Sequence, residues 1–180
     1  MSEPRAITRD RALATVAAGL QALEARKQEV NNLNVYPVPD GDTGTNLALT
    51  VKSILDELQN APLVDDPVQL CSLIEDAALM GARGNSGVIL SQMIRGAMEE
   101  LKDHGHISSD NLPAVLQRAT ETAYRAVRRP VEGTMLTVLR EMAEAAEAAS
   151  PVLSSAQLLE RVIDAGWQSV QRTQIGRAHV

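Results

Sequence analysis

Two aspartates separated by one glycine are the residues of this sequence best suited to bind a cation. Asp40 and Asp42 flank Gly41, and glycine permits the backbone curvature that both carboxylates need to reach one point. Magnesium takes one or two protein carboxylates and leaves its other positions to water and phosphate oxygens. The segment therefore predicts a magnesium site that also holds phosphate. On the pattern alone, the alternative that both aspartates only cap the following helix is equally open.

Other metal and catalytic templates fit the sequence less well. An EF-hand calcium loop beginning at Asp40 would need glycine in place of Thr45 and glutamate in place of Val51. There is no P-loop pattern, and the Gly-Asn-Ser-Gly segment at residues 84–87 lacks the final glycine of a hydrolase nucleophile elbow. His104 and His106 have no further ligand nearby and are interpreted as exposed loop residues.

The composition predicts an all-α protein and argues against several functional classes. Only 2% of the 180 residues are aromatic, and helix formers such as Ala, Leu and Glu are abundant. A net charge of −6 with so few aromatic residues argues against nucleic-acid binding. Cys71 lies in an apolar helical pattern and is predicted to be a small buried residue. No signal peptide or membrane-spanning run is recognised, so we expect a cytoplasmic protein without membrane insertion.

Helix-start and helix-stop signals divide the chain into seven predicted helices. Thr8, Asp65 or Asp66, and Asp110 are the expected caps of the first, third and fifth helices. The first helix carries an apolar stripe, and Leu79 is expected to face inward from the third. The helices are expected at about residues 8–32, 45–59, 67–80, 87–102, 110–129, 133–150 and 155–172.

The topology of these helices predicts where the chemistry lies. Short connections make neighbouring helices antiparallel, so the second, fourth and sixth helices begin at the same end. Each of these three follows a glycine-containing break that carries hydroxyl or amide side chains. Three helix N-termini beside two carboxylates predict a site for a polyphosphate and its metal.

Three segments of the chain resemble a known family. Residues 30–46 read Val-Asn-Asn-Leu-Asn-Val-Tyr-Pro-Val-Pro-Asp-Gly-Asp-Thr-Gly-Thr-Asn, and residues 78–92 and 130–138 agree with the same signature. They are similar to the N-terminal kinase domain of bacterial fatty acid kinase, within the larger family of the nucleotide-binding L subunit of dihydroxyacetone kinase. The resemblance covers about residues 8–172. It implies an up-and-down antiparallel barrel of eight helices, about seven of them present here, with ATP and two magnesium ions at one end.

The resemblance also implies roles for particular residues. Asp40 and Asp42 are the implied magnesium ligands, and Asn34 is a weaker one, because an amide stands near the position of a third aspartate in the dihydroxyacetone branch. No catalytic residue is assigned beyond the metal site. The implied nucleotide-binding residues are Thr43, Gly44, Thr45 and Asn46 at the second helix, Asn85 and Ser86 at the fourth, and Gly133, Thr134 and Met135 at the sixth.

The implied reaction is ATP-dependent phosphoryl transfer to the carboxylate of a fatty acid presented by a separate fatty-acid-binding protein. The product is an acyl phosphate, and a carboxylate acceptor needs no general base. Two alternatives remain open. One is the nucleotide-binding subunit of a dihydroxyacetone-type kinase, and the other is a non-catalytic helical regulator that binds nucleotide.

The C-terminus departs from the family pattern. Fatty acid kinases continue into an Asp-Ala-Gly-Gly-type loop, an eighth helix and further domains, whereas residues 175–180 here resemble the translation of a sequencing adapter. We therefore expect an ATP- and magnesium-binding domain at residues 1–174, incomplete at its C-terminus, and an artefactual tail at 175–180. A homodimer formed through the absent downstream domains is a further implication.

Overall fold

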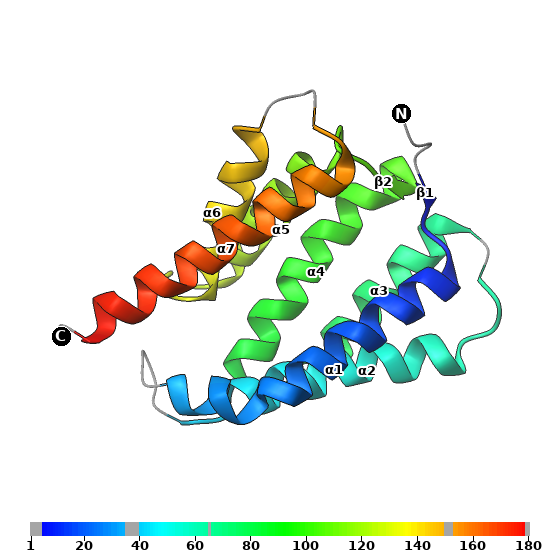
Figure 1. The fold of residues 1–180 in the computed structure, drawn as a ribbon. Helices are drawn as coiled ribbons and strands as arrows, with labels where there is room; N and C mark the ends of the chain where they lie inside the picture. Colours follow the sequence, from blue (N-terminus) through cyan, green and yellow to red (C-terminus); the bar gives the residue numbers. More distant parts are fainter. Residues whose placement is uncertain (1–4, 35–39, 65, 150–152, 179–180) are drawn as a thin grey trace.

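The described chain consists of helices that run alternately up and down. The computed structural model describes residues 5–34, 40–64, 66–149 and 153–178. In Figure 1 each helix runs antiparallel to the next one in sequence, which confirms the predicted all-α, up-and-down barrel. None of the described helices is both long and apolar enough to cross a membrane. The helices are α1 (Arg9–Leu33), α2 (Thr43–Asn60), α3 (Pro67–Met80), α4 (Gly84–His104), α5 (Leu112–Ala126), α6 (Met135–Glu147) and α7 (Ser155–Ala178).

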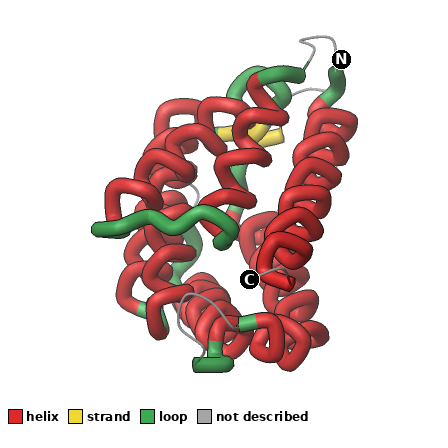
Figure 2. Tube along the Cα trace, turned by 90° about the vertical axis from the view of Figure 1, so that its left-hand side faces the viewer, coloured by secondary structure: helices red, strands yellow, loops and turns green. Residues whose placement is uncertain are grey.

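One short strand pair is present that the sequence does not predict. β1 (Arg5–Ala6) pairs antiparallel with β2 (His106–Ile107), and Figure 2 shows the pair as a small element among the helices. The N–H of Ile7 donates to the carbonyl of Gly105 at 3.0 Å and extends the pairing. Two residues are too few for an alternating pattern to appear in the sequence. The pairing satisfies backbone groups of the segment that leads into α1.

Two of the three predicted N-caps are present, and one is not. Thr8 caps α1 and Asp66 caps α3, as predicted. The prediction of Asp110 as the cap of the fifth helix is wrong by one residue, because Asn111 occupies the N-cap position of α5. Asn111 is 4% exposed, and its amide donates to the carbonyl of His106 at 2.8 Å. The buried amide is therefore fixed by the loop that it closes.

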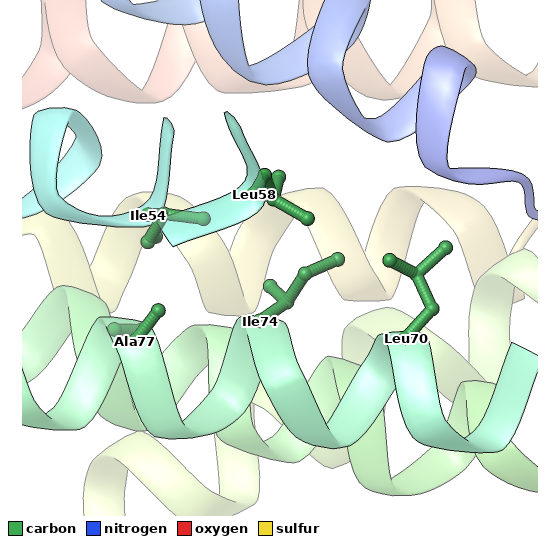
Figure 3. Close-up of a cluster of buried hydrophobic side chains, with 6 residues drawn as sticks. Ile54, Leu58, Leu70, Ile74 and Ala77 are labelled. Carbon is green, nitrogen blue, oxygen red and sulfur yellow. The ribbon is translucent and has the colours of Figure 1, made fainter. Parts of the chain in front are cut away.

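The core consists of clusters between neighbouring helices. The largest lies between α2 and α3, where the side chains in Figure 3 face one another. Cys71 is fully buried in an adjoining cluster, as predicted, and burial raises the pKa of its thiol. A third cluster joins α6 to α7. The labelled side chains of the largest cluster are Ile54, Leu58, Leu70, Ile74 and Ala77.

Two details of the predicted core differ in the structure. The stripe of α1 is only partly buried, because this helix contributes no fully buried residue. Leu79 is 50% exposed, so the prediction that it faces inward is wrong. Its neighbour Ala78 is buried instead, because successive helical residues point about 100° apart and a one-residue error changes the face.

The last helix extends further than predicted. α7 ends at Ala178 rather than near residue 172, so the expected domain limit at residue 174 falls within it; its side chains are described as far as Thr173. The artefactual origin of residues 175–180 stays a prediction. Three side chains one turn apart on α7 are about half exposed: Leu159, Ile163 and Trp167. The guanidinium carbon of Arg26, on α1, lies 5.4 Å from the ring centroid of Trp167.

Candidate functional site

The first turns of α2, α4 and α6 lie toward the same end of the molecule. In Figure 1 α2 and α4 begin at the lower left and α6 begins above them on the left, and α1, α3 and α5 run the other way. The arrangement predicted from the short connections is therefore present. Each start carries backbone N–H groups without helical acceptors and a partial positive charge. α2 packs directly against α4, and α6 packs between α5 and α7.

The start of α2 is capped by a side chain from α1. Asn31 Oδ1 accepts a hydrogen bond from the N–H of Thr45 at 3.1 Å, and Asn31 Nδ2 donates to Thr45 Oγ1 at 3.0 Å. Because a backbone N–H can only donate, the oxygen of the amide must face it. Thr45 is the third residue of α2, and its N–H is one that an N-cap side chain ordinarily satisfies. Asn31 therefore performs for α2 the task of an N-cap residue.

Asp42 occupies the N-cap position of α2 without capping it. Its carboxylate makes no capping hydrogen bond, although its backbone carbonyl accepts the helical bond from Asn46 at 2.8 Å. Gly41 has a φ of +66° and turns the backbone between the two aspartates, as predicted. Asp40 is exposed, and its Oδ1 accepts from Asn34 Nδ2. The alternative in which both aspartates serve only as helix caps therefore does not hold for Asp42.

Glycine at position 44 allows α1 to approach the start of α2. A Cβ at this position would lie 2.4 Å from the carbonyl oxygen of Lys27 and 3.0 Å from Asn31 Oδ1. A larger residue would displace both the helix and the amide that caps α2. In the described part of the chain, the N–H groups of Thr43 and Gly44 have no hydrogen-bond partner. These two groups are the donors that α2 can offer to an anion.

The first turns of α2 and α4 are in direct contact. Ser86 Oγ donates to Thr43 Oγ1 at 3.2 Å. The side-chain amide of Asn46 lies beside Gly84, where a Cβ would come within 2.1 Å of its nitrogen. Asn85 is exposed at the second position of α4. The predicted residues of the second and fourth helices therefore form one surface.

A buried threonine fixes the entry to α4. Thr50 is fully buried, and its Oγ1 accepts from the N–H of Arg83 at 3.2 Å while donating to the carbonyl of Asn46 at 2.8 Å. A Cβ on Gly87 would lie 2.4 Å from the same oxygen. Arg83 is the N-cap residue of α4 and its side chain makes no capping bond. Thr50 therefore sets where α4 begins relative to α2.

The loop before α6 is held by a charged network within α5 and α6. Glu132 accepts hydrogen bonds from Thr137 Oγ1 at 2.8 Å, from Arg140 Nη2 at 2.9 Å and from Tyr124 Oη at 3.2 Å. The hydrogen bond from Thr137 and then that from Arg140 lower the pKa of Glu132. Thr134 caps α6, as its Oγ1 accepts from the N–H of Leu136 at 3.3 Å. Local contacts therefore place the start of α6.

The structure brings together two of the three predicted groups of nucleotide-binding residues. Those of α2 and α4 touch, whereas no hydrogen bond in the described residues joins Thr134 or Met135 to either helix. Gly133, at the same end, has a φ of +78°. The N–H of Thr45, predicted to meet phosphate, is engaged by Asn31 instead.

Sequence reasoning missed Asn31 and Thr50. Asn31 lies where the first helix was expected to end, so its amide is interpreted as a helix-stop signal. Thr50 lies inside a predicted helix and carries no pattern that marks it as polar and buried. The partners of both residues lie on other helices, 14 and 33 positions away. The sequence offers only a weak signal for them: both are residues with hydrogen-bonding side chains near the glycine-containing breaks.

The two aspartates suit a magnesium ion. Among the described residues, no group of three or more His, Cys, Asp or Glu side chains could hold a metal. A cation here would take ligands from Asp40, Asp42, water and phosphate. Magnesium accepts this mixed oxygen set, whereas structural zinc and EF-hand calcium sites take more ligands from the protein.

The fold defines an all-α domain of antiparallel helices in which α2, α4 and α6 begin toward one end. The DAK2 domain family matches residues 37–179. The chain therefore belongs to the DAK2 domain family, which is associated with nucleotide-binding, kinase-type subunits.

The chain is also similar to proteins of Staphylococcus aureus. Uncharacterized proteins of strains USA300, NCTC 8325 and N315 are each 43% identical to it over 159 residues. The aligned region covers 88% of this chain and 29% of each relative. The chain thus spans less than a third of the length of these relatives. Their names state no substrate, so the comparison supports the family and leaves the acceptor to be argued from the site.

Proposed function

We propose that the joined starts of α2 and α4, with the start of α6 at the same end, bind ATP or ADP together with magnesium. We further propose that the domain transfers a phosphoryl group from ATP to the carboxylate of a fatty acid, which a separate fatty-acid-binding protein presents. Asp40 and Asp42 would hold magnesium, with Asn34 beside Asp40. The N–H groups of Thr43 and Gly44, and those that open α4, would face the phosphates.

The observation that carries this proposal is the unused carboxylate of Asp42. An aspartate at an N-cap normally accepts an N–H of its own helix. Asp42 makes no such bond: its backbone (φ −120°, ψ 2°) lies outside the extended conformation of an N-cap, and Asn31 satisfies the N–H of Thr45. Asp40 lies on the other side of the Gly41 turn, so two carboxylates stand beside a helix N-terminus without a capping role. A bound cation would compensate their charge and that of a phosphate.

The proposed roles divide between the metal and the protein. Magnesium, when bound, neutralises the charge that builds on the phosphoryl oxygens during transfer. The protein positions the nucleotide. The helix starts orient the phosphates through their N–H groups, and the contacts between α2 and α4 keep these N–H groups in fixed relative positions.

The two described histidines lie far from the proposed site, which is compatible with a carboxylate acceptor. His104 is the last residue of α4 and His106 lies in β2, whereas the proposed site lies at the first turn of α4. A helix of 21 residues is roughly 30 Å long. Neither histidine can therefore serve as a base for a hydroxyl acceptor at this site. A fatty acid carboxylate is already a nucleophile and needs none.

The domain proposed for this function comprises residues 1–174. Residues 175–180 are proposed to be foreign to it, and the genomic sequence downstream of codon 174 tests that boundary. A homodimer through downstream domains also remains a proposal.

Replacement of Asp42 tests the proposed site. We expect Asp42→Asn to abolish the magnesium-dependent binding of ADP, a loss of more than about 3 kcal/mol or ~100-fold, because one metal carboxylate is removed. Isothermal titration calorimetry with and without MgCl2 measures the loss, and circular dichroism checks that helicity is unchanged.

Asp66→Asn is the matched control. Asp66 is also an N-cap aspartate, but its carboxylate accepts from the N–H groups of Val68 and Gln69. Asparagine caps equally well, so this variant should bind magnesium and ADP as the unaltered chain does. Equal ADP affinity in Asp42→Asn and Asp66→Asn would remove Asp42 from the metal site.

A further inference from the structure

We propose that Asn31 is a positioning residue for the metal site, which caps α2 from the neighbouring helix and so leaves the carboxylate of Asp42 free for a cation. This inference rests on the proposed function and adds a residue of α1 to it. Asn31 uses both polar groups of its amide on Thr45, and neither is directed to the metal.

Two aspartates at equivalent helix positions support this role. Asp66 is the N-cap residue of α3, and its carboxylate accepts from the N–H groups of the second and third helical residues at 3.4 and 3.2 Å. Asp42 holds the same position in α2, yet its carboxylate makes no such bond. The third N–H of α2 instead donates to Asn31. Residue type and helix position are equal, but the backbone of Asp66 is extended (φ −84°, ψ 120°) and that of Asp42 is not (φ −120°, ψ 2°). In this conformation the carboxylate of Asp42 does not cap its helix, and the amide from α1 supplies the acceptor for Thr45.

Without the Asn31 amide, the N–H of Thr45 and the cation would compete for the carboxylate of Asp42. The N–H of Thr45 would lose its acceptor, and an unpaired N–H at a partly buried helix start is costly. With the extended backbone that Asp66 has, Asp42 could offer its carboxylate to this N–H. Asp42 would then cap its own helix and would have to break that bond in order to bind a cation.

The metal dependence of ADP binding tests the inference in the presence of ligand. ADP affinity is measured by calorimetry at a series of MgCl2 concentrations, which gives the half-saturating magnesium concentration. For Asn31→Ala we expect this concentration to rise roughly five-fold, the factor that corresponds to one N-cap hydrogen bond. Asn32→Ala is the matched control, because the amide of Asn32 accepts from Gln28 on the same helix and, among the described residues, makes no hydrogen bond to α2. It should leave the value unchanged.

Thermal unfolding without any ligand tests whether Asp42 caps α2 when the amide of Asn31 is absent. While Asn31 is present, Asp42→Ala removes no capping bond and should leave the Tm within about 1 °C. In an Asn31→Ala background, the same change removes the replacement cap and should lower the Tm by about 3 °C more. Additive effects of the two substitutions on the Tm would show that Asp42 does not replace Asn31 as the cap.

The remaining outcomes separate this inference from the proposed function. If the unaltered chain binds no ADP with magnesium, the proposed function fails and the positioning role falls with it. If the unaltered chain binds and Asn31→Ala has an unchanged half-saturating magnesium concentration, the inference alone is wrong. Should Asn31→Ala not fold, Asn31→Asp serves instead, because it keeps an acceptor for the N–H of Thr45. A raised half-saturating concentration in Asn31→Asp would also overturn the inference.

Discussion

The helix starts at the site end are fixed in two different ways. The starts of α2 and α4 are held by contacts between helices, in which Asn31 caps α2 and Thr50 receives the N–H before α4. The start of α6 is held by the hydrogen bonds of Glu132 within α5 and α6. The first arrangement depends on close approach and neutral hydrogen bonds. The second depends on an exposed carboxylate.

This difference predicts a rigid side and an adjustable side of the candidate site. Partly buried, neutral hydrogen bonds between helices move only if the helices separate, and such separation costs core packing. An exposed charged network is screened by salt and can be protonated. We therefore expect the α2–α4 surface to keep its geometry under conditions in which the loop before α6 loosens.

The largest expected effect comes from filling the close approach at Gly44. Gly44→Ala places a methyl group 2.4 Å from a backbone oxygen of α1 and should lower the free energy of unfolding by about 3 kcal/mol. Gly133→Ala is the comparison on the α6 side. No heavy atom lies within 4 Å of its added Cβ, so only the strain of a φ near +78° remains, about 1 kcal/mol. Urea unfolding measures both, and equal losses would contradict the proposed contrast.

An intermediate effect is expected at Thr50. Thr50→Val keeps the shape of the side chain but leaves the N–H of Arg83 without its acceptor, which should cost about 2 kcal/mol of unfolding free energy. Thr120→Val is the control, because among the described residues the buried hydroxyl of Thr120 makes one hydrogen bond, to the carbonyl of Leu116 on the same helix. That change should cost about 1 kcal/mol or less. If the control loses as much as Thr50→Val, the link between α2 and α4 is not what stabilises this region.

The smallest effect is expected at Glu132, and it should depend on pH. Hydrogen bonds from Thr137 and then Arg140 hold the pKa of Glu132 below its usual value of 4.5. A lowered pKa adds stability that is present above the usual value and is lost as the pH falls through the lowered one. The side chain is 62% exposed, so the contribution is below about 1 kcal/mol.

Unfolding curves at two pH values measure this contribution. Glu132→Gln should be less stable than the unaltered chain near neutral pH, and the difference should vanish once the carboxyl is protonated in acid. Thr137→Val removes the main donor and should shrink the pH-dependent part of the difference. A difference that persists unchanged in acid would show that the charge of Glu132 has no part in holding the loop.

The fold was predictable because its signals are local. Thr8 and Asp66 cap helices whose first N–H groups lie two or three residues further along the chain. Helix direction follows from short connections, which is why the common end of α2, α4 and α6 could be predicted. Errors arose where one residue decides a face or a cap, as at Leu79 and Asp110.

The site was predictable in its location and not in its internal contacts. The turn at Gly41 and its flanking aspartates form a compact pattern that sequence can show. The cap from Asn31 crosses from one helix to another, and so does the hydrogen bond from Arg83 to Thr50. Such contacts depend on how closely two helices approach, and no periodicity along one helix encodes that distance. The sequence alone therefore does not decide whether the carboxylate of Asp42 caps its helix.

The contact between α1 and α7 gives the chain an optical property. Trp167 is the single tryptophan in the sequence, its side chain is half exposed, and the guanidinium of Arg26 lies over its ring. Tryptophan emission responds to local polarity and to nearby charge, so the fluorescence of the unlabelled protein reports on one point between its first and last helices. Any separation of α1 from α7 would register as a spectral change without the attachment of a dye.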